Sequence, residues 1–92
     1  MKPTISICYC PKCGWMLRSA YMAQELLITF AGVVYGVTLV PSDTSGVFQV
    51  YADETLIFDR QTEQRFPEIK ELKQLVRDRV SPGMSLGHSD KK

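Results

Sequence analysis

The chain has 92 residues, which is the length of one domain and leaves no room for two. Apolar residues make up 45% and charged residues 23%, a balance that is typical of a folded chain and excludes a disordered one. The formal net charge is only +1, which argues against a nucleic acid or an acidic membrane surface as a partner held by bulk charge.

The sequence also lacks the expected signs of a membrane or secreted protein. The longest nearly uncharged stretch, residues 26–41, is too short and too polar for a transmembrane helix. The first residues lack the apolar core and the small-residue cleavage site of a signal peptide. We therefore expect a cytoplasmic protein, where cysteines stay reduced unless they have a function.

The first half of the chain predicts a β-α-β unit. Residues 4–9 alternate between apolar and polar, which predicts a strand with Ile5, Ile7 and Tyr9 on one face. Residues 15–30 predict a helix, because apolar residues recur at steps of three and four: Met16, Ala20, Ala23, Leu27 and Phe30. Residues 33–40 are rich in Val and nearly uncharged, which favours an interior strand of a parallel pair.

The second half predicts a hairpin and a helix. The loop 41–46 is followed by short strands at 47–51 and 55–59, and 60–65 is a polar connection. A helix is expected to enter at 66–68 and to end before Ser81, with one apolar stripe: Ile69, Leu72, Leu75, Val76 and Val80. We expect a domain over residues 1–83 and a polar, mobile C-terminal tail over 84–92.

The order β-α-β-β-β-α indicates the fold class. The first unit is long enough for a right-handed crossover between parallel strands, and the hairpin then extends the sheet in antiparallel fashion. We predict a thioredoxin-like two-layer α/β fold with a mixed four-stranded sheet. The loop 41–46 is too short for the extra helix that thioredoxin and glutaredoxin have after the second strand.

The chemistry of the chain is expected at Cys10-Pro11-Lys12-Cys13, which joins the first strand to the first helix. In a cytosolic chain beside a β-α-β pattern, a C-x-x-C motif favours thiol–disulfide chemistry. Free N–H groups and the helix dipole stabilise a thiolate at a helix start, and Lys12 adds positive charge. We therefore predict Cys10 and Cys13 as the catalytic residues, forming a reversible intramolecular disulfide.

Two alternatives to redox chemistry remain for these cysteines: a zinc site and an inert pair. Zinc normally takes four ligands, and this chain offers only Cys8, Cys10, Cys13 and the distant His88. We therefore expect no metal and no bound cofactor. Cys8 is interpreted first as a small buried apolar residue and second as an auxiliary redox thiol.

Five segments in this order resemble the selenoprotein W-like group of the Rdx (SelT/SelW/SelH) family, in its cysteine-containing bacterial branch. They are Tyr9-Cys10-x-x-Cys13-Gly14-Trp15, Gln24-Glu25-Leu26-Leu27-x-x-Phe30, Gly46-Val47-Phe48-x-Val50, Phe66-Pro67-Glu68-Ile69-Lys70-x-Leu72-Lys73 and Leu86-Gly87-His88-Ser89-Asp90. The resemblance covers nearly the whole chain. It implies a thioredoxin-like fold and a thiol-redox role in cell redox homeostasis, with glutathione or protein thiols and disulfides as partners.

The sequence departs from this family in one respect that affects the chemistry. Animal members commonly carry selenocysteine at the second motif position, where this chain has Cys13. The chain also lacks the Thr-Val-Pro segment and the Gly-Gly pair of glutaredoxin, so no glutathione pocket follows from the resemblance. The residues leave two functions open: a thiol–disulfide oxidoreductase, or a redox-gated interaction module without efficient turnover that binds partners through Trp15 and the rim of the cysteine loop.

Two observations point to different cysteines as the nucleophile that attacks the substrate disulfide. As the first thiol of the motif, Cys10 is expected to be the more exposed sulfur and the nearer to the free N–H groups, and so to have the lower pKa. The selenocysteine position of the animal relatives instead matches Cys13. Both groups are thiols in this chain, so position must supply the activation, and this favours Cys10 as the nucleophile.

Overall fold

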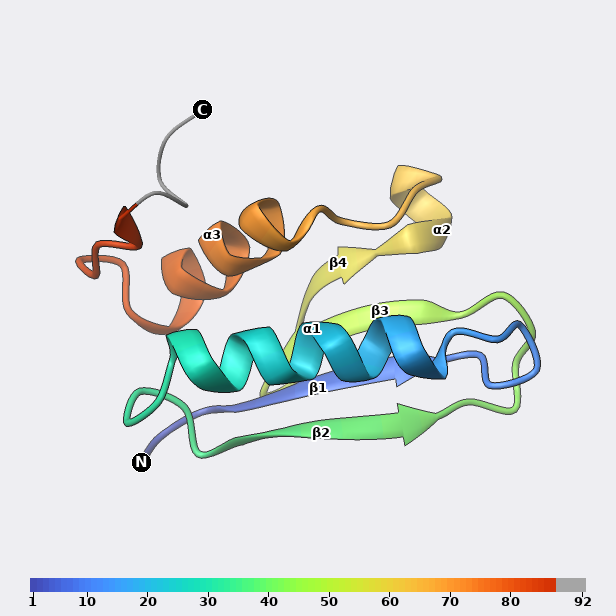
Figure 1. The fold of residues 1–92 in the computed structure, drawn as a ribbon, viewed down its shortest axis with the longest axis horizontal. Helices are drawn as coiled ribbons and strands as arrows, with labels where there is room; N and C mark the ends of the chain where they lie inside the picture. Colours follow the sequence, from blue (N-terminus) through green and yellow to red (C-terminus); the bar gives the residue numbers. More distant parts are fainter. Residues whose placement is uncertain (88–92) are drawn as a thin grey trace.

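The computed structural model describes residues 1–87, which contain four strands and three helices, arranged as Figure 1 shows. In chain order the elements are β1 (Thr4–Tyr9), α1 (Met16–Thr29), β2 (Gly36–Pro41), β3 (Phe48–Ala52), β4 (Thr55–Asp59), α2 (Arg60–Glu63) and α3 (Ile69–Val80). The predicted order is confirmed, with one addition. The expected polar connection at 60–65 contains the short helix α2, which begins because Asp59 caps it by accepting a hydrogen bond from the Gln61 N–H.

The four strands form one mixed sheet in the order β2-β1-β3-β4. β1 runs parallel to β2 and antiparallel to β3, and β3 pairs with β4 as a hairpin. The thioredoxin-like two-layer α/β class and the mixed four-stranded sheet are therefore confirmed. No helix lies between β2 and β3, as the short loop predicted.

The prediction that residues 33–40 form an interior strand is wrong, because β2 lies at an edge of the sheet. Its Thr38 and Val40 are exposed, and among the strands of residues 1–87 it pairs with β1 alone. The nearly charge-free sequence of β2 suggested burial on both faces. The central position instead belongs to β1, which pairs with β2 on one side and β3 on the other.

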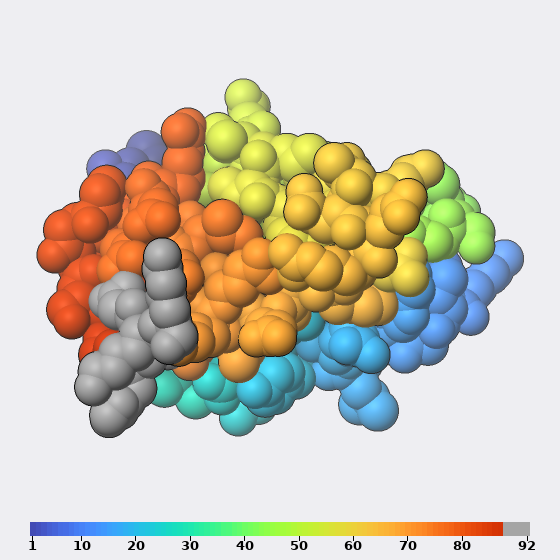
Figure 2. All heavy atoms as spheres, turned by 90° about the horizontal axis from the view of Figure 1, so that it is seen from above, coloured from blue at the N-terminus to red at the C-terminus, as the bar shows by residue number. Residues whose placement is uncertain are grey.

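The core lies on one face of the sheet. Ile5, Ile7 and Tyr9 alternate inward from β1, as predicted, and Phe48 and Val50 do so from β3. Residues of α1 and α3 belong to the same buried cluster, so both helices cover that face. Figure 2 looks onto α3 and α2, with α1 partly visible below them.

The buried face of α1 agrees with the predicted one only in part, since Ala23 and Phe30 are buried as predicted. Leu26 is fully buried and Met22 nearly so, whereas Leu27 is 45% exposed and Met16 is 46% exposed. The helix carries apolar residues on almost its whole circumference, so its periodicity alone did not fix which side faces the sheet. The apolar stripe of α3 is confirmed at Leu72 and Val76, which are fully buried.

Ser19 on the buried face of α1 gives a prediction about stability. Its side chain is fully buried, and its Oγ has no hydrogen-bond partner in the described part of the chain. An unsatisfied buried hydroxyl costs about 1–3 kcal/mol, and Ala is the better helix former. Ser19→Ala is therefore expected to raise the free energy of unfolding by about 1 kcal/mol, as measured by urea denaturation. A loss of stability would show that the hydroxyl has a partner in solution.

The segments around α3 are held by side-chain contacts. Arg65 forms a bidentate ion pair with Glu71, both N–O distances being 2.7 Å, which ties the segment before α3 to its first turn. Beyond α3, Met84 and Leu86 pack against the core, so ordered packing continues past residue 83 into the expected tail. The rest of that tail, including His88, lies outside the described residues.

None of the helices over residues 1–87 has the length and apolar content needed to span a lipid bilayer.

Candidate functional site: the Cys10–Cys13 loop

The cysteine motif lies in the loop between the central strand and the longest helix. β1 ends at Tyr9, α1 begins at Met16, and the Tyr9 hydroxyl donates a hydrogen bond to Met16 Sδ at 2.9 Å, which joins the two ends. Within the loop, the Gly14 N–H donates to the Pro11 carbonyl at 3.1 Å and closes a turn. Gly14 has a φ of +77°, a conformation that favours glycine because it has no Cβ.

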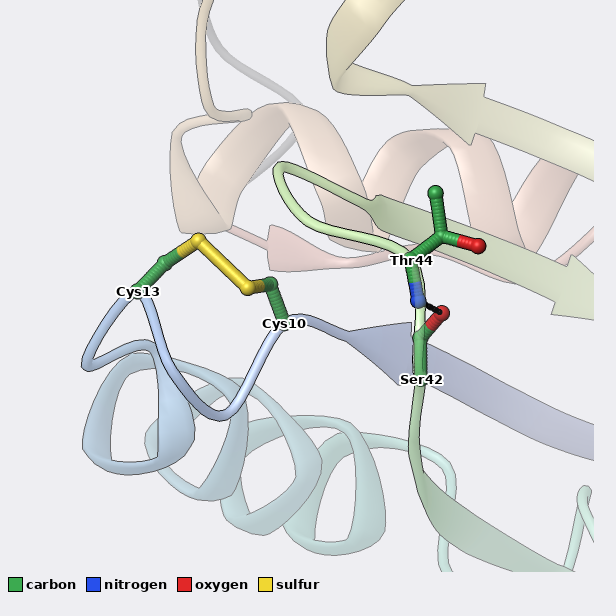
Figure 3. The surroundings of a disulfide bond; sticks show 4 residues. All are labelled: Cys10, Cys13, Ser42 and Thr44. Atoms are coloured by element: carbon green, nitrogen blue, oxygen red, sulfur yellow. Dashed lines mark hydrogen bonds between the residues drawn. A yellow bond between two sulfur atoms is a disulfide. The ribbon is translucent and has the colours of Figure 1, made fainter.

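Cys10 and Cys13 form a disulfide in this loop, as Figure 3 shows. Their Cα atoms are 5.4 Å apart, close to the usual separation in protein disulfides. The structure thus brings together the two residues that the sequence predicted as a pair. That they cycle between dithiol and disulfide, and that they are catalytic, stay predictions.

The two cysteines differ in accessibility, and in the opposite sense to that expected. Cys10 is buried, with 2% of its surface exposed, whereas Cys13 is half-buried. The expectation that Cys10 would be the more exposed sulfur is therefore wrong. Cys10 directly follows the last residue of the central strand, whereas Cys13 lies within the turn, near the helix start.

The start of α1 is electropositive and has no capping side chain. Trp15 is the N-cap residue and makes no side-chain cap hydrogen bond, and the first turn contains no acidic residue. The free N–H groups of that turn are therefore not neutralised from within the helix. Cys13 lies only two positions before the N-cap, and a helix end of this kind favours a thiolate nearby.

A shallow pocket of about 260 Å³ lies beside the disulfide. It is formed by the cysteine loop and the loop after β2, which Figure 3 shows next to each other. The second loop is fixed by the Ser42 N–H, which donates to the Tyr9 carbonyl at 2.8 Å, and by the Thr44 N–H, which donates to Ser42 Oγ at 3.0 Å. The lining residues are Cys10, Pro11, Lys12, Ser42, Asp43 and Ser45.

Trp15 packs inward rather than forming an open platform. Its ring lies edge-to-face with Phe66, the centroids being 4.8 Å apart, and both residues pack against the core. Two arginines stack on this aromatic pair: Arg18 from α1 and Arg60 from α2. This cluster is not evident from the sequence, because Phe66 and Arg60 are more than forty positions from the motif and no local pattern joins them.

Cys8, the third cysteine, lies apart from the disulfide, and this bears on the zinc alternative. Cys8 is a free, half-buried thiol on the face of the sheet opposite to the helices, so it is not the fully buried residue that we expected. Within residues 1–87, no group of three or more His, Cys, Asp or Glu side chains is arranged to hold a metal ion. His88, the fourth ligand considered, is not among these residues.

The geometry defines a thioredoxin-like protein with a C-x-x-C disulfide between the central strand and a helix start. Comparison with known families identifies the family. The model of the Rdx family matches residues 4–78, and the chain therefore belongs to the Rdx family, a redox-related family. The resemblance inferred from the five sequence segments is thus confirmed.

Two crystal structures of bacterial proteins are similar over most of the chain. A protein from Bordetella parapertussis is 48% identical with a TM-score of 0.84, covering 87% of this chain and 100% of its own. A selenoprotein W-related protein from Vibrio cholerae is 47% identical with a TM-score of 0.83, covering 88% of this chain and 100% of its own. The comparison with curated proteins gave no match.

Proposed function

We propose that this protein is a small thiol–disulfide redox protein that cycles Cys10 and Cys13 between dithiol and disulfide. The observation that carries the proposal is the bonded pair at a helix start with no capping side chain. Membership of a redox-related family supports it. The role belongs to cell redox homeostasis in the cytoplasm, with glutathione or protein thiols and disulfides as partners. The reaction needs no metal and no bound cofactor.

In the proposed reaction Cys13 attacks and Cys10 resolves. The Cys13 thiolate attacks one sulfur of a substrate disulfide; a new S–S bond forms, the substrate S–S bond breaks and the first substrate thiolate leaves. The Cys10 thiolate then attacks Cys13 Sγ and releases the second substrate thiol. The protein dithiol is oxidised and one substrate disulfide is reduced to two thiols. The greater exposure of Cys13 and its place near the helix start support this order.

Reaction of the reduced protein with oxidised glutathione tests this function. We expect Cys10 and Cys13 to become linked, with a loss of two hydrogens by peptide mass spectrometry, and two equivalents of reduced glutathione to be released. In the Cys10→Ser variant the resolving thiol is gone, so a mixed disulfide should accumulate on Cys13. A Cys8→Ser background removes the third thiol. A stable bond between Cys8 and Cys10, or no reaction with any disulfide, would contradict the proposal.

A second candidate function is a redox-gated interaction module, favoured by the outer face of α1. Leu17 is 84% exposed, Tyr21 is 51% exposed and Ile28 is 65% exposed, and their spacing of four and seven places them on one side of the helix. Leu17 lies four residues after Cys13, near the loop that the disulfide closes. If this function is the right one, reduced and oxidised protein will differ in partner capture while exchange with small disulfides stays slow.

A further inference from the structure

Two arginines surround one aromatic side chain next to the cysteine loop. The guanidinium carbon of Arg18 lies 4.1 Å from the centroid of the Phe66 ring, and that of Arg60 lies 4.9 Å from the same centroid. Arg60 is also 4.8 Å from the ring centroid of Trp15. Two positive charges thus share one aromatic pair, an arrangement that a nearby anion would stabilise.

Neither guanidinium has a carboxylate partner among residues 1–87. No ion pair within 4.0 Å joins Arg18 or Arg60 to an acidic side chain, and the Nε of Arg60 is buried without a hydrogen-bond acceptor. The Asp59 carboxylate next to Arg60 is already used, because it accepts hydrogen bonds from the Gln61 N–H and the Thr62 hydroxyl. Other cations of the protein do have such partners: Arg65 with Glu71, Lys73 with Glu25 and Arg77 with Asp78.

The unpaired arginines lie at the cysteine end of the molecule. Arg18 is in the first turn of α1, and Trp15, on which Arg60 stacks, is two residues after Cys13. In Figure 1, α2 and the loop between β1 and α1 lie at the same end, and in Figure 2 the gold residues around α2 border the blue start of α1. Lys12 in the loop adds positive charge, and it has no ion pair with any acidic side chain in the described range.

We propose that Arg18 and Arg60 bind a carboxylate of the disulfide substrate, so that the protein selects disulfides that carry an acidic group near the reacting sulfur. The inference rests on the proposed thiol–disulfide function and names its substrate class. Guanidinium groups suit this role because they bind carboxylates in a bidentate fork while stacking on aromatic rings. The acidic group comes from a small peptide disulfide such as oxidised glutathione, or from an acidic residue beside a protein disulfide.

The reaction of the substrate is the exchange described above. Cys13 forms a bond to the nearer substrate sulfur, the substrate S–S bond breaks, and Cys10 then closes the protein disulfide and releases the second thiol. The arginines take no part in these bond changes. They bind the carboxylate of the substrate and so position its disulfide near Cys13. Their removal therefore changes the rate of thiol–disulfide exchange for acidic substrates only.

The experiment measures second-order rate constants of the reduced protein with two disulfides of opposite charge, oxidised glutathione and cystamine. Arg18→Gln and Arg60→Gln are each expected to lower the rate with oxidised glutathione roughly threefold to tenfold, and to leave or raise the rate with cystamine. Arg60→Lys keeps the charge and much of the packing. Its rate constant with oxidised glutathione should therefore fall less than that of Arg60→Gln. The matched control is Arg79→Gln on α3, where the guanidinium donates to the Thr55 hydroxyl.

Each outcome of this experiment decides one proposal. Equal losses with both disulfides, or no loss with either, would overturn the carboxylate site and leave the redox function standing. If the reduced wild-type protein reacts with neither disulfide, both proposals fall together. A further pair of short peptide disulfides, with Glu or Gln next to the cysteine, distinguishes the two sources of the carboxylate. A preference for the Glu peptide that Arg18→Gln abolishes identifies acidic protein segments, whereas a preference confined to oxidised glutathione identifies the small peptide.

Discussion

Cys13 is expected to be alkylated quickly near neutral pH in a Cys8→Ser, Cys10→Ser variant. A thiol at an electropositive helix start commonly has a pKa of about 3.5–7.5, against about 8.5 for a free thiol. Cys13 lies two positions before the N-cap of α1, which lacks both a capping side chain and an acidic first turn. Its alkylation at pH 7 should therefore be faster than that of a thiol in an unfolded peptide.

The companion variant, Cys8→Ser with Cys13→Ser, retains only Cys10. Because Cys10 is 2% exposed, the reagent reaches it only when the loop opens. Its rate at pH 7 is expected to be lower than that of Cys13 on the order of tenfold or more, and unfolding in denaturant should remove the difference. Fast alkylation of Cys10 with slow alkylation of Cys13 would reverse the two roles and restore the assignment that the sequence favoured.

Replacing Leu26 by Ala is expected to destabilise the fold strongly, whereas replacing Leu27 should not. Leu26 is fully buried against the sheet, and Leu→Ala at such a site costs about 2–5 kcal/mol through lost burial and the cavity left behind. Leu27 is 45% exposed, and substitutions at such surface sites usually cost below about 1 kcal/mol. Both variants exchange the same residue types in one helix, so helix propensity changes equally and cancels in the comparison.

Urea denaturation of the two variants, monitored by circular dichroism, measures this difference as a change in midpoint at constant slope. The measurement also tests the orientation of α1 directly, because the sequence analysis placed Leu27 in the core. A larger loss for Leu27→Ala than for Leu26→Ala would mean that α1 is rotated about its axis from the position described here.

The redox state of the Cys10–Cys13 pair affects the proposed exchange reaction and the proposed carboxylate binding differently. With Cys10 bonded to Cys13, the thiolate of the proposed reaction is absent, so we expect only the reduced form to exchange with disulfides. The arginine pair on Phe66 and Trp15 is formed by side chains outside the bond, so we expect the proposed carboxylate binding in either redox state.

The sequence by itself determined the element order and the cysteine pair. Alternation at Ile5, Ile7 and Tyr9 and the spacing of Leu72 and Val76 depend on local periods of two and 3.6 residues, which neighbouring residues fully specify. The Cys10-x-x-Cys13 pairing is local in the same sense, because two intervening residues suffice to bring both sulfurs together at a turn. The family could be inferred because its five matching segments keep their order along the chain.

Only the tertiary structure decided the features that depend on contacts between segments distant in the sequence. Which side of α1 is buried, Leu26 or Leu27, depends on how the helix lies on the sheet, because both positions are apolar. The edge place of β2 depends on which side of β1 the hairpin joins. The greater exposure of Cys13 and the gathering of Arg18 and Arg60 around Phe66 arise where segments distant in sequence meet, and no local pattern encodes such long-range contacts.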